Sequence, residues 1–152
     1  MLTPTTMASL EPRENTMAEE NHLAVQANMK SIKYASEGNK EGWLALYADD
    51  ALVQDPVGVS PMDPSGEGHQ GKAAIEAFWD NVIGPSNIEI TVNKRWLSGP
   101  NCVCVAQVAR NDLGNGKFSD CDMLAVYVVN DEGLITSMKA HWDFDALIAQ
   151  LS

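Results

Sequence analysis

The sequence has few basic residues for its length. Its 10 lysines and arginines stand against 21 aspartates and glutamates, which gives a formal net charge of −11 at pH 7. A charge of this sign repels phosphate backbones and anionic lipid head groups, and no local cluster of Lys and Arg offsets it. The composition therefore excludes nucleic acid and membrane surfaces as expected partners.

Several other signals are absent as well. No apolar run reaches the length of a membrane-spanning helix, and the N-terminus lacks the basic start and apolar stretch of a secretory signal. The three cysteines, Cys102, Cys104 and Cys121, are odd in number and lie in apolar runs, so we read them as packing residues rather than disulfide or zinc ligands. No glycine-rich phosphate loop is present. We expect a cytoplasmic protein that uses no metal or other cofactor.

The length of 152 residues, 45% of them hydrophobic, suits one domain with a sizeable core. Residues 1–16 contain two prolines and almost no apolar periodicity, so they are predicted to be a disordered leader before a domain spanning 17–152. A capping-box pattern at Thr16 and Glu19 begins a first helix that ends near Gly38. A short second helix is predicted through Trp43, Leu44 and Tyr47.

The rest of the chain predicts a short strand, a third helix and four longer strands. Residues 51–55 read as the strand, 56–70 as a loop, and 72–84 as an amphipathic helix. Four β-rich segments follow at 88–97, 102–110, 118–129 and 134–144, separated by turns. Helices first and long strands last give an α+β architecture, in which a curved antiparallel sheet receives the helices on its concave face.

Asp55 is the main candidate for chemistry. It ends the first strand on the same side as Val53, and Pro56 then turns the chain away. A carboxylate among apolar side chains has a raised pKa and is a stronger base than a solvated one. The alternative interpretation is an ordinary aspartate that caps its own turn.

A family resemblance covers most of residues 25–151. It is carried by three runs: GNKEGWLALYADDALVQDPVG, GKAAIEAFWDNVI and DEGLITSMKAHW. They resemble the bacterial ketosteroid isomerases and related SnoaL-type proteins of the nuclear transport factor 2-like superfamily. The resemblance implies three N-terminal helices and a bent sheet that form a cone with an apolar pocket (a cystatin-like α+β barrel), usually in a homodimer. It also implies that Asp55 is the general base that moves a proton between two carbons of a ketosteroid.

The sequence departs from this family at the oxyanion hole, which pairs a tyrosine with a protonated aspartate. Counting without gaps puts Ser31 at the tyrosine position and Ala125 at the aspartate position, while Tyr47 and Trp79 occupy the places of two supporting tyrosines. Ser31, Tyr34 and Tyr127 are the candidate substitute donors. Tyr127 is preferred because it shares a strand face with Ala125, although a core tyrosine is an equally good interpretation.

The remaining predicted site residues line the pocket. The full set of expected substrate contacts comprises Tyr34, Tyr47, Val53, Phe78, Trp79, Val82, Val108, Ala125, Met138, Ala140 and Trp142.

The leading hypothesis is a cofactor-free steroid Δ-isomerase-like enzyme acting on a steroid- or polyketide-like molecule, with Asp55, Tyr127 and Ser31 as catalytic residues. A non-catalytic binding protein and a SnoaL-like cyclase or hydrolase are the alternatives. A homodimer is expected through the outer sheet face, to which Val126, Val128, Ile135 and His141 are assigned.

Overall fold

The computed structural model describes residues 13–151, which form six strands and six helical segments. The helices are α1 (Met17–Glu20), α2 (Leu23–Glu37), α3 (Lys40–Leu44), α4 (Lys72–Phe78), the π-helical segment η2 (Trp79–Ile83) and α5 (Phe144–Ala149). The strands are β1 (Tyr47–Gln54), β2 (His69–Gln70), β3 (Ile88–Ser98), β4 (Cys102–Gly114), β5 (Lys117–Val129) and β6 (Ile135–His141).

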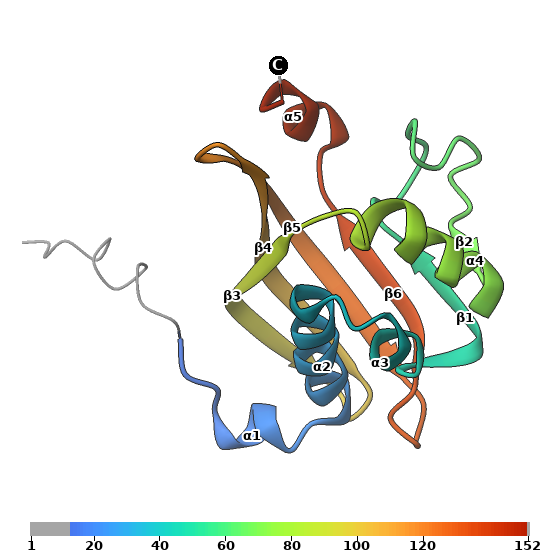
Figure 1. Cartoon of the computed structure of the whole chain (residues 1–152). Helices are drawn as coiled ribbons and strands as arrows, with labels where there is room; N and C mark the ends of the chain where they lie inside the picture. The colour runs from blue at the N-terminus through green and yellow to red at the C-terminus, as the bar shows by residue number, and fades with distance from the viewer. Residues whose placement is uncertain (1–12, 152) are drawn as a thin grey trace, which may run out of the picture.

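The strands form one curved, unclosed sheet in the order β2-β1-β6-β5-β4-β3. The predicted antiparallel meander from β3 to β6 is confirmed, and the α+β class with it. Two features differ from the prediction. The first strand joins the sheet parallel to β6, and the predicted loop 56–70 contains β2 at its end, which pairs with β1. Figure 1 shows α2 and α3 lying across one face of this sheet, with α4 beside β1 and β2.

The helices follow the predicted order with shifted boundaries. The first predicted helix is broken after α1, because the ring of His22 accepts hydrogen bonds from the backbone N–H groups of Ala24 and Val25 and starts α2. Gly38 ends α2 with a φ of 69°, a left-handed conformation that glycine adopts without strain. The third helix changes from α to π at Trp79, and the second ends at Leu44, so Tyr47 begins a strand.

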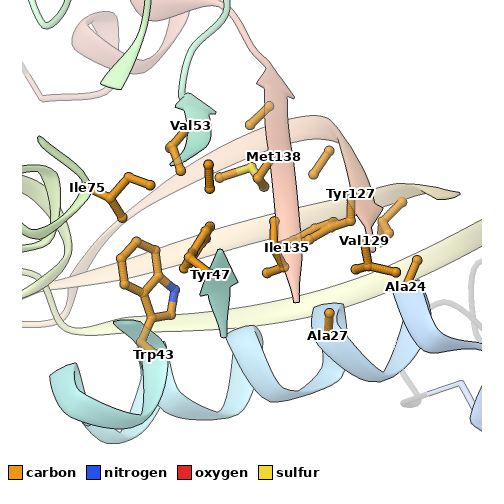
Figure 2. Close-up of a cluster of buried hydrophobic side chains, with 14 of the residues drawn as sticks. Ala24, Ala27, Trp43, Tyr47, Val53, Ile75, Tyr127, Val129, Ile135 and Met138 are labelled. Carbon is orange, nitrogen blue, oxygen red and sulfur yellow. The ribbon is translucent and has the colours of Figure 1, made fainter. Parts of the chain in front are cut away.

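The hydrophobic core fills one end of the space between the helices and the sheet. Ala24 and Ala27 of α2 face Ile135 and Val129 of the sheet, and Trp43 of α3 packs on the ring of Tyr47 at a centroid distance of 4.7 Å (Figure 2). All of these side chains are buried. The other end of the same space is left open as a cavity.

Two irregularities change which side chains point inward. Val92 pairs with Gln107, but the next pair is Lys94 with Ala106, so Asn93 is an extra residue in β3. Arg95 therefore points inward and is 8% exposed. A second irregularity between β5 and β6 turns Ile135 into the core, where it is fully buried, so its assignment to the outer face is wrong.

Both ends of the described segment differ from the prediction. Asn15 and Thr16 hydrogen-bond to Arg95 and Glu19, so residues 13–16 are tied to the domain although a disordered leader is predicted up to residue 16; residues 1–12 of that leader lie outside the described residues. The last strand ends at His141 rather than at Phe144, because Asp143 caps α5. No helix within residues 13–151 is both long enough and apolar enough to cross a membrane.

Candidate active site

The cavity lies between the concave face of the sheet and the helices, and has a volume of about 180 Å3. Most of its walls are apolar. Alternate residues of β3, β4, β5 and β6 form one wall, α2, α4 and η2 form the other, and Leu147 of α5 lies at its edge. Such a concave apolar space with few polar groups is the usual form of a small-molecule site.

Asp55 supplies the carboxylate in this lining. It follows β1, and the parallel pairing of Val53 with Met138 brings it beside the end of β6. There the indole Nε1–H of Trp142 donates a hydrogen bond to Asp55 Oδ1 at 2.5 Å. No Lys, Arg or His within the described part of the chain forms an ion pair with Asp55 at 4.0 Å or less.

The environment of Asp55 raises the pKa of its carboxyl toward neutral pH. Burial raises the pKa of the Asp55 carboxyl from 3.8 to about 6, and the hydrogen bond from Trp142 opposes this rise. The residue is still partly accessible, and it lines the cavity. Near pH 7 the carboxylate is therefore largely ionised, next to apolar surface, and able to accept a proton.

A second polar group in the cavity joins α2 to β5. Ser31 Oγ accepts a hydrogen bond from Trp43 Nε1 at 3.2 Å and a longer one from the Tyr127 hydroxyl at 3.4 Å. Burial is the main cause that raises the pKa of Tyr127, so this hydroxyl stays protonated at neutral pH. Ser31 and Tyr127 are therefore neutral O–H groups on the cavity wall, as an oxyanion hole requires.

Most of the predicted site residues line the cavity. These are Ser31, Asp55, Phe78, Val82, Ala125, Tyr127, Met138, Ala140 and Trp142.

Three of the other predicted contacts belong to the core instead. Val53 is fully buried in β1, and Tyr47 and Trp79 both pack on Trp43, at centroid distances of 4.7 and 5.2 Å. The hydroxyl of Tyr47 is buried and has no hydrogen-bond partner among the described residues. The positions that resemble supporting tyrosines therefore form an aromatic cluster beneath Ser31.

Two further predictions need correction. Val108 faces away from the cavity because its neighbours Gln107 and Ala109 occupy the inward positions of β4; it lines a separate hollow beside α5. Tyr34 is half-buried against the core and is absent from the cavity lining, where Ala35 stands instead.

Sequence reasoning missed much of the sheet wall. The additional lining residues there are Ile88, Ile90, Gln107, Ala109, Asn111, Ser119, Cys121 and Met123. The alternation that links Ala125 to Tyr127 contains this signal: extending it backward along β5 gives Met123, Cys121 and Ser119. Gln107 alone among these is a fully buried amide, at 3% exposure.

No group of three or more His, Cys, Asp or Glu side chains comes together within residues 13–151 to hold a metal ion. The three cysteines are free thiols. We therefore assign no residue of the described chain to a metal site.

The comparisons with known proteins agree with this geometry. The SnoaL-like domain model matches residues 30–138. A steroid Δ-isomerase of Nocardioides simplex is 29% identical over 105 residues, which cover 69% of this chain and 77% of that protein. The crystal structure of the Δ5-3-ketosteroid isomerase from Mycobacterium sp. has a TM-score of 0.76 and 36% identity, covering 82% of this chain and 96% of its own.

A further solved neighbour contains a ligand. RV0760c from Mycobacterium tuberculosis in complex with estradiol-17β-hemisuccinate has a TM-score of 0.77 and 33% identity, covering 82% of this chain and 97% of its own. Fold and site together define a small α+β domain with an apolar pocket. The chain belongs to the SnoaL-like domain family, within the nuclear transport factor 2-like superfamily that its sequence resembles.

Proposed function

We propose that the cavity binds a steroid- or polyketide-like ketone and that Asp55 moves a proton between two of its carbons. The observation that carries this proposal is the environment of Asp55: a carboxylate within an apolar cavity, hydrogen-bonded to Trp142, with its pKa raised to about 6 by burial. Burying such a group without a cation lowers stability, and a base of this strength suits catalysis near neutral pH.

The reaction needs only the groups of this chain. Asp55 removes a proton from the carbon between the carbonyl and the β,γ double bond, and the C–H electron pair forms a dienolate. The negative charge then lies on the former carbonyl oxygen. The Ser31 hydroxyl donates a hydrogen bond to it, and the Tyr127 hydroxyl, which donates to Ser31 Oγ in the free protein, turns to donate to it as well. The protonated Asp55 returns the same proton to the γ carbon, so the product is the conjugated enone and no electrons are gained or lost.

The similar proteins support this substrate class. Two of them are named as steroid or ketosteroid isomerases, and one was solved with a steroid ester in place. An apolar cavity with polar groups at only a few points fits a flat, rigid molecule with one carbonyl better than a charged metabolite.

The test is the ultraviolet absorbance of the conjugated enone formed from a β,γ-unsaturated ketosteroid. We expect turnover by the native protein, loss of turnover in Asp55→Asn, and a smaller loss in Tyr127→Phe and Ser31→Ala. Asp122→Asn is the matched control, because this exposed carboxylate lies on β5 and faces away from the core. Equal turnover in the native protein and Asp55→Asn contradicts the proposal.

Binding without turnover is the second candidate function. Ala125 lines the cavity where the resemblance implies a protonated aspartate, and loss of an oxyanion donor costs about 10²–10³-fold in rate. Quenching of tryptophan fluorescence by the steroid, together with absent enone formation, favours this candidate over the isomerase.

We also propose a homodimer through the outer sheet face. That face exposes Trp96 and Leu124, at 44% and 45%, next to the half-buried Val126. Sedimentation is expected to give a dimer, and Leu124→Lys is expected to give a monomer because it places a charge in the apolar contact. A monomeric native protein at micromolar concentration contradicts this assembly.

A further inference from the structure

A buried polar network connects the N-terminal segment to the cavity. The extra residue Asn93 turns Arg95 inward beneath α2, where its Nε donates a hydrogen bond to Asn28 Oδ1 at 3.0 Å. Asn28 Nδ2 donates in turn to Gln107 Oε1 at 3.3 Å. Asn28 is fully buried and Gln107 is 3% exposed, so these bonds form in a dry environment.

The guanidinium of Arg95 fixes the direction of the hydrogen bonds in this network. A guanidinium only donates, so the side of Asn28 that faces Arg95 must be its oxygen. The NH2 of Asn28 is then directed at Gln107, which must present its own oxygen to Asn28. The NH2 of Gln107 is left for the other side, where Gln107 lines the cavity.

This NH2 group has little to bind within the protein. Its one hydrogen-bond partner among the described residues is the thioether Sδ of Met123, at 3.5 Å, and a thioether is a weak acceptor. A buried amide nitrogen carries two hydrogens, and leaving them poorly bonded costs free energy. Gln107 therefore has donor capacity that a ligand oxygen in the cavity can use.

Gln107 also stands near the position of the missing aspartic acid. Val105 pairs with Ala125, and Gln107 pairs with Met123, so Gln107 and Ala125 are diagonal neighbours on the inward face of β4 and β5. Side chains in this relation reach one another, and glutamine is one methylene longer than aspartate. An amide N–H from β4 thus borders the space that Ala125 leaves open on β5.

The charges behind Asn28 favour negative charge at the cavity end of the network. Arg95 and Arg13 both bind Glu19, at 3.3 and 2.9 Å, so two guanidinium groups share one carboxylate. The Arg95 side chain is 2% exposed, which leaves its charge poorly screened. Successive hydrogen bonds from a cation polarise one another, which strengthens the last donor of the network, the NH2 of Gln107.

We propose that the Gln107 amide N–H is a further oxyanion donor beside Tyr127 and Ser31, which binds the carbonyl oxygen of the ligand in place of the absent aspartic acid. Asn28 and Arg95 are positioning residues that hold the amide with its nitrogen toward the cavity. This inference deepens the proposed isomerase function and rests on it for the catalytic role, while the binding role of Gln107 is testable by itself.

The experiment compares two ligands of the same shape. 2-Naphthol in its ionised form presents an oxyanion, and naphthalene presents none. We expect Gln107→Leu to weaken 2-naphthol binding about tenfold or more and to leave naphthalene binding unchanged within about twofold, because a hydrogen bond to a charged oxygen contributes about 1.5–3 kcal/mol. Val108→Thr is the matched control on the opposite face of β4.

A second variant tests the direction of the network. Asn28→Asp still accepts from Arg95 but cannot donate, so the amide of Gln107 must turn its nitrogen toward position 28 and its oxygen toward the cavity. A side-chain hydrogen bond with Asn28 also opposes the rise in the pKa of Tyr127 that burial causes, so the variants are compared in a Tyr127→Phe background. There we expect the same loss of 2-naphthol affinity in Asn28→Asp as in Gln107→Leu, and no further loss when both changes are combined. Thermal unfolding establishes whether each variant is folded. If Gln107→Leu is not folded, Asn28→Asp is used to test the role of Gln107.

The outcomes separate this inference from the isomerase proposal. Three results would overturn the role of Gln107. The first is unchanged 2-naphthol affinity in a folded Gln107→Leu or Asn28→Asp protein. The others are equal weakening of both ligands and no binding of 2-naphthol to the native protein. If the native protein has no isomerase activity but Gln107→Leu selectively weakens 2-naphthol, the donor stands and the proposed reaction fails. If turnover depends on Asp55 but is the same in Gln107→Leu, the proposed reaction stands and the catalytic role of Gln107 fails.

Discussion

Glu19 and Asp55 are two carboxylates with shifted pKa values, and their partners differ completely. Glu19 accepts hydrogen bonds from Arg13 on both oxygens at 2.9 Å, from Arg95 at 3.3 Å and from the backbone N–H of Thr16. Asp55 accepts one, from Trp142. The bonds from Arg13, the largest cause, lower the pKa of Glu19 to about 2, whereas burial raises the pKa of Asp55 to about 6.

This comparison separates a carboxylate that is held as an anion from one whose pKa lies close to neutral pH. Glu19 is surrounded by donors that all favour its anionic form, so it exchanges no proton at physiological pH. Asp55 lacks a cationic partner and borders an apolar cavity, so its two protonation states are close in free energy near neutral pH. The cationic partner keeps Glu19 ionised, whereas burial without such a partner brings the pKa of Asp55 close to neutral pH.

The largest expected effect is on the rate. Asp55→Asn removes the proton acceptor and is expected to lower kcat/KM for a β,γ-unsaturated ketosteroid by about 10²–10⁴-fold. In the native protein kcat/KM is expected to rise with pH through about 6, the pKa of Asp55, and then to level off. Enone absorbance at a series of pH values measures both effects. A flat profile between pH 5 and 8 would falsify the assignment of Asp55 as the base.

The second prediction concerns stability rather than rate, and Glu19 rather than Asp55. Glu19→Gln leaves the buried guanidinium of Arg95 without its ion pair, which is expected to lower the free energy of unfolding by about 3–5 kcal/mol. Urea unfolding measures the loss, and Glu20→Gln, an exposed neighbour on α1, is the control. A loss below about 1 kcal/mol contradicts the structural role of Glu19.

The third prediction concerns stability and pH. The folded pKa of Asp55 is raised from 3.8 to about 6, so the folded state holds its proton more tightly than the unfolded state does. Stability is therefore lost as pH rises from about 4 to about 6, by roughly 3 kcal/mol since each pKa unit corresponds to about 1.4 kcal/mol. Glu19 acts in the opposite direction, and its contribution is lost as pH falls from 4.5 toward 2.

Chemical unfolding at several pH values tests these signs. The decrease between pH 4 and 6 should be absent in Asp55→Asn, and the decrease at lower pH should be reduced in Glu19→Gln. An Asp55→Asn protein with the same pH dependence as the native one rules out the shifted pKa.

The smallest expected effect comes from the hydrogen bond to Asp55. Trp142→Phe keeps an aromatic ring but removes the N–H donor that lowers the pKa of Asp55, so this pKa should rise. The midpoint of the kcat/KM profile is then expected to move to higher pH, with little change in the plateau at high pH. A midpoint that stays in place contradicts the role of this bond.

Local sequence patterns predicted most of the elements, but not β2 or the break between α1 and α2, and they predicted the position of Asp55. Alternation along β5 put Ala125 and Tyr127 on the inward face, and alternation along the last strand did the same for Met138, Ala140 and Trp142, all of which line the cavity. The position of Asp55 after an apolar strand was likewise readable. These features depend on the two-residue period of a strand, which is a local property.

The tertiary structure alone decided the polar contacts around the cavity and added Gln107 to its lining. Asn93 and the irregularity near Ile135 reverse the alternation in β3 and β6, and so bring Arg95 and Ile135 inward against the simple pattern. The insertion of β1 beside β6 joins Asp55 to Trp142, 87 residues apart, and α2 joins Arg95 to Gln107 through Asn28. Such bonds depend on which strands become neighbours and where a bulge falls, because both are set by packing across the whole domain rather than by any local sequence period.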